Sequence, residues 1–144
     1  MTLFPAMEAH PTPWVHEQVT PIAIAVVRRG NEVLVGVRPE DSPLAGFAEF
    51  PGGKCHPGEA PESAAVRECF EETGLHVQAV RRLCEVEHSY AHGRLYLTFI
   101  ECEAVADAEP RGSFRWVAIP QLRHYRFPEA NARVLAILQA TGGG

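Results

Sequence analysis

Residues 53–75 read GKCHPGEAPESAAVRECFEETGL and carry the most informative spacing in this chain of 144 residues. The second half of the stretch predicts a helix with Pro61 in its first turn, where a missing backbone N–H costs little. Gly74 is placed to end that helix, because glycine adopts the left-handed conformation of a helix C-cap without strain. The stretch therefore predicts a loop followed by one helix.

Three carboxylates lie on this helix, Glu68, Glu71 and Glu72, at positions i, i+3 and i+4, so they share one face. Like charges so close repel one another, which leaves two interpretations: a solvated acidic face, or a site for a hard divalent cation. The approach to the helix, FPGGK at residues 50–54, favours the second. Two adjacent glycines let the backbone approach a ligand, and Lys54 adds a cation suited to phosphate.

The spacing of these residues resembles the Nudix box of the Nudix hydrolases. The fixed points are Gly53, Glu59, Arg67, Glu68, Glu71, Glu72 and Gly74. Seven fixed positions, each filled by a residue type used at about 5–8%, match at a given start by chance on the order of once in 10⁸. The one departure is Cys69, where the family usually has a larger aliphatic residue, and a small buried cysteine still suits a core position.

The resemblance implies a role for each residue of the box. Metal ligands are expected from the carbonyl of Gly52 and the carboxylates of Glu68 and Glu72, with Glu71 as a further ligand. The implied cofactor is Mg²⁺, with Mn²⁺ as a substitute. The implied catalytic set is Glu68, Glu71, Glu72, Arg67 and Lys54, and Gly53, Glu59 and Gly74 are implied to be structural. Arg67 is expected to pair with Glu59 or a neighbouring carboxylate.

The identity of the general base stays open. Family members use either a glutamate of the box, here Glu68, or an acid from a distant loop. The acids available outside the box are Asp107 and Glu109, in a polar loop at residues 105–112.

Substrate-binding residues are expected outside the box. The segment RPEDSPLAGFAEFPGGK resembles the corresponding loop of MutT-type Nudix enzymes, which implies nucleotide contacts from Arg38, Glu49 and Phe50. The segment RFPEAN resembles their F-P-x-A-N segment, which implies that Asn131 hydrogen-bonds a purine edge. The plainer interpretations are a solvated Arg38, a core Phe50, a Glu49 that caps local backbone and an Asn131 that only begins a helix. Ala48 stands where the family often has a larger residue.

Composition fits one globular domain of residues 20–141, preceded by an irregular N-terminal arm of residues 1–19. The formal net charge of −5 gives no general attraction for a nucleic-acid polymer. The four cysteines form no CxxC pair and suit a reducing cytoplasm. No apolar run is long enough to span a membrane, and no signal peptide is apparent. The expected partner is a nucleotide, with the protein a cytoplasmic monomer or homodimer.

Strand and helix patterns continue on both sides of the box. The predicted strands are residues 20–28, 32–38, 76–88, 94–103 and 113–119, and a final helix is predicted at 129–139. In residues 95–99 we expect one face in the core and the other along a cavity or water. The fold class is α+β, and the resemblance implies the Nudix fold, an α/β/α sandwich with a mixed β-sheet between helices.

The leading hypothesis is an Mg²⁺-dependent hydrolase that converts a nucleoside triphosphate to the monophosphate and pyrophosphate, with 8-oxo-dGTP as substrate. The alternatives are a Nudix pyrophosphohydrolase acting on CTP or dCTP, ADP-ribose or a dinucleoside polyphosphate, and a Nudix-like module that senses nucleotides without hydrolysing them. Because Glu68, Glu71 and Glu72 are all present, the sequence favours catalysis over sensing.

Overall fold

The computed structural model describes residues 18–91 and 93–142. The predicted arm at residues 1–19 therefore lies outside the described part, except for its last two residues. These two belong to the first strand, which begins at Gln18 rather than at Thr20.

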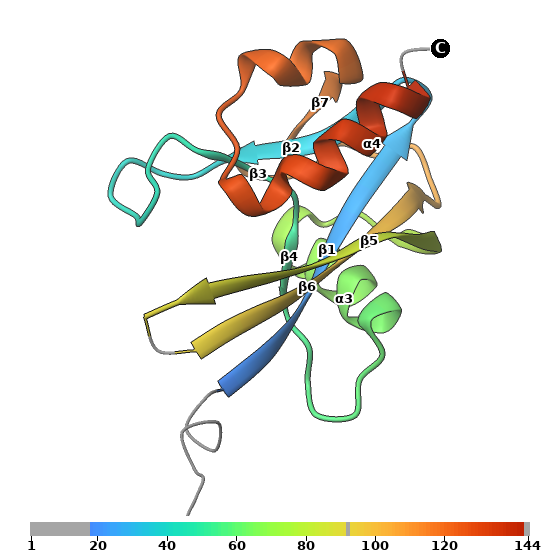
Figure 1. The fold of residues 1–144 in the computed structure, drawn as a ribbon. Helices are drawn as coiled ribbons and strands as arrows, with labels where there is room; N and C mark the ends of the chain where they lie inside the picture. The colour runs from blue at the N-terminus through green and yellow to red at the C-terminus, as the bar shows by residue number, and fades with distance from the viewer. Residues whose placement is uncertain (1–17, 92, 143–144) are drawn as a thin grey trace, which may run out of the picture.

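A mixed sheet forms the centre of the protein (Figure 1). Its strands are β1 (Gln18–Arg29), β2 (Glu32–Val37), β3 (Ala48–Glu49), β4 (Gly52–Lys54), β5 (Val77–Tyr90), β6 (Gly93–Ala104) and β7 (Arg115–Ala118). The strand order is β3-β2-β1-β6-β5, with β4 paired to β1 and β7 to β2. The β1–β6 pair is parallel and the other pairs are antiparallel, so the predicted mixed sheet is confirmed.

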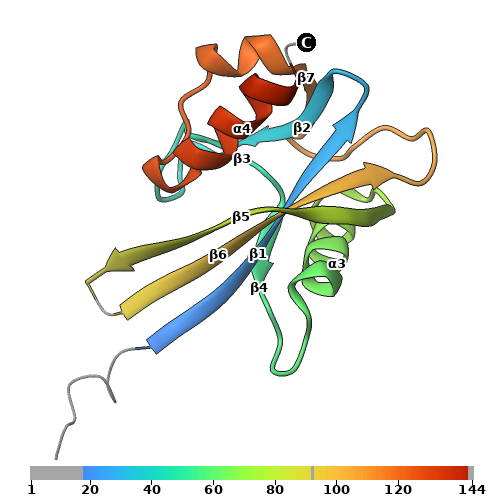
Figure 2. The ribbon, with the colours of Figure 1, turned by 45° about the vertical axis from the view of Figure 1, so that its right-hand side comes forward.

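Helices cover the two faces of this sheet (Figures 1 and 2). One face carries α3 (Pro61–Thr73), and the other carries η1 (Ile119–His124), η2 (Glu129–Asn131) and α4 (Ala132–Gly142). The predicted α/β/α sandwich is therefore confirmed. None of the helices in the described ranges is long and apolar enough to cross a bilayer.

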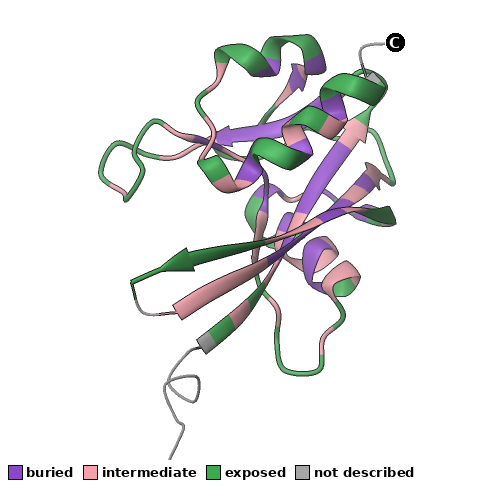
Figure 3. Ribbon diagram, viewed as in Figure 1, coloured by how far each residue is buried: buried purple, intermediate pink, exposed green. Residues whose placement is uncertain are grey.

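Strand β1 separates two hydrophobic cores, because alternate side chains of a strand point to opposite faces. Ile22, Ile24 and Val26 face the α4 side, whereas Ala23 and Ala25 face α3. The small alanines let the buried Ala64 and Ala65 of α3 approach the sheet closely. Figure 3 shows buried residues running through the sheet beneath both helical layers. The site described below depends on this close contact between α3 and the sheet.

The predicted helix at 61–73 agrees with the structure, and Gly74 caps it in the left-handed conformation with φ 79°. Two other predictions need correction. Thr98 is only 2% exposed, so its face of β6 is interior there rather than along a cavity or water. The predicted helix at 129–139 starts as the 3-10 helix η2 before continuing as α4, so Asn131 is the last residue of η2.

Candidate active site

The glycine pair brings strand β4 into contact with both β1 and α3. Gly52 pairs with Ile24 and Gly53 with Ala23 in an antiparallel ladder. A Cβ atom on Gly52 would lie 2.5 Å from the carbonyl oxygen of Ala23, and one on Gly53 would lie 2.5 Å from the carboxyl carbon of Glu68. Neither position has room for a side chain, so Gly52 lets β4 pack against β1, and Gly53 lets the Glu68 carboxylate lie directly against the strand.

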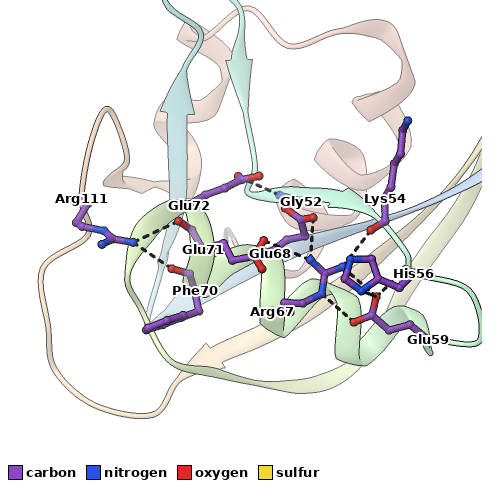
Figure 4. A network of polar contacts seen from close by, with 10 residues as sticks. All are labelled: Gly52, Lys54, His56, Glu59, Arg67, Glu68, Phe70, Glu71, Glu72 and Arg111. Atoms are coloured by element: carbon purple, nitrogen blue, oxygen red, sulfur yellow. Dashed lines mark hydrogen bonds and ion pairs between the residues drawn. The ribbon is translucent and has the colours of Figure 1, made fainter.

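Arg67 joins the loop, the strand and the helix (Figure 4). Its Nε and Nη2 donate to the two carboxylate oxygens of Glu59, each at 2.9 Å. Nη2 also donates to the carbonyl oxygen of Lys54, and Nη1 donates to Glu68 at 3.1 Å and Glu71 at 3.3 Å. The predicted pairing of Arg67 with Glu59 is therefore present, in the bidentate form that gives both strength and orientation.

The protonation of Glu59 follows from this contact. Hydrogen bonds from Arg67 first, and then the backbone N–H of His56 at 2.8 Å, lower the pKa of Glu59 to about 2. The hydrogen bonds to Glu59 first, and then to Glu68, raise the pKa of Arg67. Glu59 is thus a fixed anion that holds the loop before α3.

Glu72 lies on the same helix but in a different environment. Its carboxylate accepts a hydrogen bond from the backbone N–H of Gly52 at 3.3 Å. Although the residue as a whole is solvent-exposed, its carboxylate is desolvated where it meets β4, and this, together with Glu68, raises the pKa of Glu72 to about 7. Two neighbouring carboxylates resist sharing a site as anions unless a cation is present.

The donor chemistry at Glu68 and Glu72 fits a divalent cation. Both are hard oxygen ligands beside the Gly52–Gly53 backbone, and among the residues that the structure describes no basic side chain forms an ion pair with Glu72. The side chain of Glu71 is 54% exposed and turns toward Arg67. Within the described ranges no group of three or more acidic, histidine or cysteine side chains converges on one point. The structure therefore brings Glu68 and Glu72 together and leaves Glu71 at the edge.

Two other residues of the predicted catalytic machinery lie apart from the glutamates. Lys54 is exposed, and its side chain extends away from them in Figure 4. Asp107 is 95% exposed, with its carboxylate 3.9 Å from Arg29 at the last residue of β1. Gly52 pairs with Ile24, five residues earlier on that strand, so Asp107 lies beyond the far end of the site. Of the acids considered as general base, Glu68 has its carboxylate against Gly53.

A cavity of about 190 Å³ adjoins the glycine pair on the α4 side of the sheet. Its wall contains all four predicted substrate-binding residues, which are Arg38, Glu49, Phe50 and Asn131, together with Gly52 and Gly53. The other lining residues are Ile22, Ile24, Leu44, Ala48 and Pro128. One continuous wall therefore connects the acidic helix region to the residues expected to hold a nucleoside.

The predicted substrate-binding residues differ in their contacts and in their burial. Arg38 donates from Nη1 to Glu49 at 3.1 Å and from Nε to the carbonyl oxygen of Pro43 at 2.7 Å, so it also holds its own loop. Phe50 is 5% exposed and stacks on Phe127 with a centroid distance of 5.0 Å, so it is both core and cavity wall. Asn131 is 7% exposed, which is unusual for an amide side chain.

Sequence reasoning missed Leu44. It lines the cavity while 53% exposed, and among the described residues it is the one non-glycine with a positive φ, at 60°. Its left-handed backbone conformation and its place in the cavity wall make Leu44 a candidate for ligand contact. No sequence pattern marks it, because both its exposure and its backbone conformation come from the loop fold.

Comparisons with known proteins agree with this geometry. A family model for the NUDIX domain matches residues 23–136. The chain is 34% identical over 123 residues to the 8-oxo-dGTP diphosphatase of Escherichia coli, covering 82% of this chain and 95% of that protein. A CTP pyrophosphohydrolase of E. coli is 41% identical over 54 residues, covering 38% of this chain and 40% of that protein. A solved MutT structure, from work on Aliivibrio salmonicida and Vibrio cholerae, superimposes with a TM-score of 0.69 at 30% identity, covering 85% and 97% of the two chains.

Proposed function

The chain belongs to the Nudix family and is a pyrophosphohydrolase, and we propose that it hydrolyses 8-oxo-dGTP to the monophosphate and pyrophosphate with Mg²⁺ as cofactor. The observation that carries this proposal is the continuous cavity wall. It runs from Gly52 and Gly53, beside the carboxylates of α3, to Asn131, the last residue of η2. A nucleotide bound along this wall has its phosphates at the acidic helix and its base at the amide.

Charge neutralisation is the main requirement at the phosphate end, since the negative oxygens of a diphosphate repel a nucleophile. When bound, Mg²⁺ or Mn²⁺ supplies that positive charge and lowers the pKa of a bound water. In our proposal Glu68, Glu72 and the carbonyl of Gly52 would hold the ion, with Glu71 as a further ligand. Arg67 holds Glu68 in place, and Glu68 is the proposed general base because its carboxylate lies against the glycine pair.

The base end of the cavity supports a purine. The Asn131 amide carries N–H donors beside a carbonyl acceptor in a nearly buried position, which suits the edge of a guanine or its oxidised form. Phe50 supplies an apolar surface, and the Arg38–Glu49 pair leaves carboxylate acceptor capacity at the rim. The match to the NUDIX family model runs over residues 23–136 and so includes these residues as well as the box.

A second substrate class, the pyrimidine triphosphates, is favoured by one observation. The chain is 41% identical to a CTP pyrophosphohydrolase, over 54 residues. That match is shorter than the match to the 8-oxo-dGTP diphosphatase, so we rank CTP second. A non-hydrolytic sensor is disfavoured, because the carboxylates of Glu68 and Glu72 are both placed at the glycine pair.

The test is a nucleotide panel with Mg²⁺ and identification of the products. We expect the highest kcat/KM with 8-oxo-dGTP, and release of the monophosphate with pyrophosphate rather than of single phosphates. Equal rates for 8-oxo-dGTP, dGTP and CTP would refute the substrate proposal. Release of inorganic phosphate would refute the proposed site of cleavage.

A further inference from the structure

The loop between β6 and β7 brings a cation, rather than an acid, to the catalytic helix. Arg111 donates from Nη2 to the carbonyl oxygens of Phe70 at 3.3 Å and Glu71 at 3.2 Å, at the C-terminal end of α3 (Figure 4). Its backbone N–H donates to the carbonyl oxygen of Thr73 at 2.8 Å. Three contacts from one loop residue thus close the last turn of the helix.

This end of α3 is electrostatically unfavourable without such a residue. The last carbonyl groups of a helix have no partner within it, and together they carry a partial negative charge. The last turn of α3 contains no basic residue, but it does carry the carboxylates of Glu71 and Glu72. Negative side chains therefore sit at the negative end of the helix, where a cation stabilises and a further anion destabilises.

The fit of Arg111 against the helix end is close. Gly74 has φ 79°, and a Cβ atom there would lie 3.0 Å from Nε of Arg111. The glycine that ends the helix therefore also leaves the space that the guanidinium occupies. One guanidinium nitrogen, Nη2, donates to both carbonyl oxygens, and the planar group holds that nitrogen in place more rigidly than the flexible stem of a lysine holds its ammonium.

We infer that Arg111 is a positioning residue that fixes the last turn of α3, and with it the carboxylates of Glu71 and Glu72, for binding the divalent cation. The inference rests on the proposed function for the identity of that cation. Within the described ranges, the side-chain hydrogen bonds of Arg111 go to backbone carbonyls of the helix, so it acts through the orientation and local potential of the carboxylates rather than on the substrate. Residues that orient metal ligands typically change metal affinity or activity by about 10-fold to 100-fold when replaced.

Replacement of the side chain alone isolates this role. In Arg111→Met the backbone N–H that bonds Thr73 remains, so the variant removes the guanidinium and keeps the loop tether. Arg111→Lys keeps the charge and loses the planar guanidinium that holds Nη2 between the two carbonyl oxygens. Arg123→Met is the matched control, because Arg123 is an exposed arginine on η1, on the opposite side of the sheet from α3.

The experiment titrates Mn²⁺ into each metal-free variant, follows binding by electron paramagnetic resonance, and measures steady-state kinetics. We expect Arg111→Met to bind Mn²⁺ about 10-fold more weakly and to lose about 10-fold in kcat, with the nucleotide KM within about twofold of wild type. Arg111→Lys recovers part of both losses, and Arg123→Met matches wild type. Unchanged Mn²⁺ affinity in Arg111→Met, even with a lower melting temperature, would overturn the inference.

The Mn²⁺ titration keeps this inference separable from the proposed function. It needs no nucleotide, so a chain that hydrolyses none of the panel still gives a clear result for Arg111. If Arg111→Met does not fold, Mn²⁺ affinity and kcat of Arg111→Lys test the inference instead. Mn²⁺ affinity between those of wild type and of Glu72→Gln supports the positioning role, and affinity equal to wild type with unchanged kcat refutes it.

Discussion

The phosphate end and the base end of this site are built in different ways. The phosphate end comes from residues 52–72, in which β4 and α3 are neighbours in sequence and in space. The base end is assembled from segments far apart in the chain, since its wall combines Ile22 of β1, Arg38 after β2, Glu49 of β3 and Asn131 of η2. A short motif thus fixes the chemistry, while the whole fold is needed to shape the base site.

The difference implies that mutations divide into two groups. Changes around Glu68 and Glu72 should lower turnover of every nucleotide alike, because each substrate carries the same diphosphate. Changes around Arg38 and Asn131 should act through affinity and choice of base. The following variants test that division, beginning with the largest effect.

Glu72→Gln should cause the largest loss. Replacing the carboxylate removes a proposed ligand that lies beside Gly52, so kcat should fall by several orders of magnitude for every nucleotide in the panel. Glu71→Gln is the comparison, with a smaller loss expected because its side chain is more exposed and turned toward Arg67. Steady-state rates at saturating Mg²⁺ decide, and a near-normal rate in Glu72→Gln contradicts the metal assignment.

Gly53→Ala should lower kcat by roughly 10-fold to 100-fold, because the new Cβ would displace the Glu68 carboxylate. The φ of Gly53 is not positive, so backbone strain does not complicate the result. Glu68→Ala in the same assay gives the rate expected when that carboxylate is lost altogether. The measurement is kcat on two different nucleotides, and we expect equal proportional losses. Unequal losses would mean that Gly53 also affects recognition of the nucleobase.

Arg38→Met should act on the other end of the site. It removes the bonds to Glu49 and to the Pro43 carbonyl, which hold the loop that carries Leu44. We expect KM to rise by about 10-fold with kcat within about threefold. Arg115→Met, at an exposed arginine on β7, is the control. A fall in kcat with unchanged KM would place Arg38 in the chemical step and contradict the division.

The smallest effect is a pH dependence of stability in the metal-free protein. The pKa of Glu72 in the folded state is about 7, above its usual value of 4.5, so folding favours the protonated form. The contribution of Glu72 to the free energy of unfolding is therefore complete below about pH 4.5 and is lost as the pH rises through 7. Relative to Glu72→Gln, wild type in a chelator should therefore lose about 2–5 °C in melting temperature between about pH 5 and pH 8.

Thermal melts followed by circular dichroism measure this difference. Added Mg²⁺ should reverse it, because a cation stabilises the ionised carboxylates. Melting temperatures of the two metal-free proteins that run parallel with pH would contradict the assigned cause, which is the desolvation of the Glu72 carboxylate beside Glu68.

The sequence predicted what local geometry determines. Helix periodicity placed the three glutamates, a left-handed glycine ended the helix at Gly74, and the Arg67–Glu59 pair formed as expected. It could not predict side-chain directions set by the fold. Lys54 is near the glutamates in sequence, yet its side chain extends away from them.

Long-range packing also decided the loop between β6 and β7. The sequence offers two acids of this loop, Asp107 and Glu109, as candidates for the general base, yet Asp107 lies beside Arg29. The residue of this loop that reaches α3 is Arg111, whose contacts span about 40 positions in sequence. Charge type and loop position do not reveal which residue of a loop meets a distant helix end.

The most direct test of the division between the two ends is a competition between 8-oxo-dGTP and CTP in one reaction. Wild type, Gly53→Ala and Asn131→Ala are compared by the ratio of the two kcat/KM values. We predict that kcat/KM for 8-oxo-dGTP divided by kcat/KM for CTP is well above one in wild type. The ratio should be the same in Gly53→Ala, despite its slower turnover, and close to one in Asn131→Ala. A ratio that changes in Gly53→Ala, or that is unchanged in Asn131→Ala, would contradict the account.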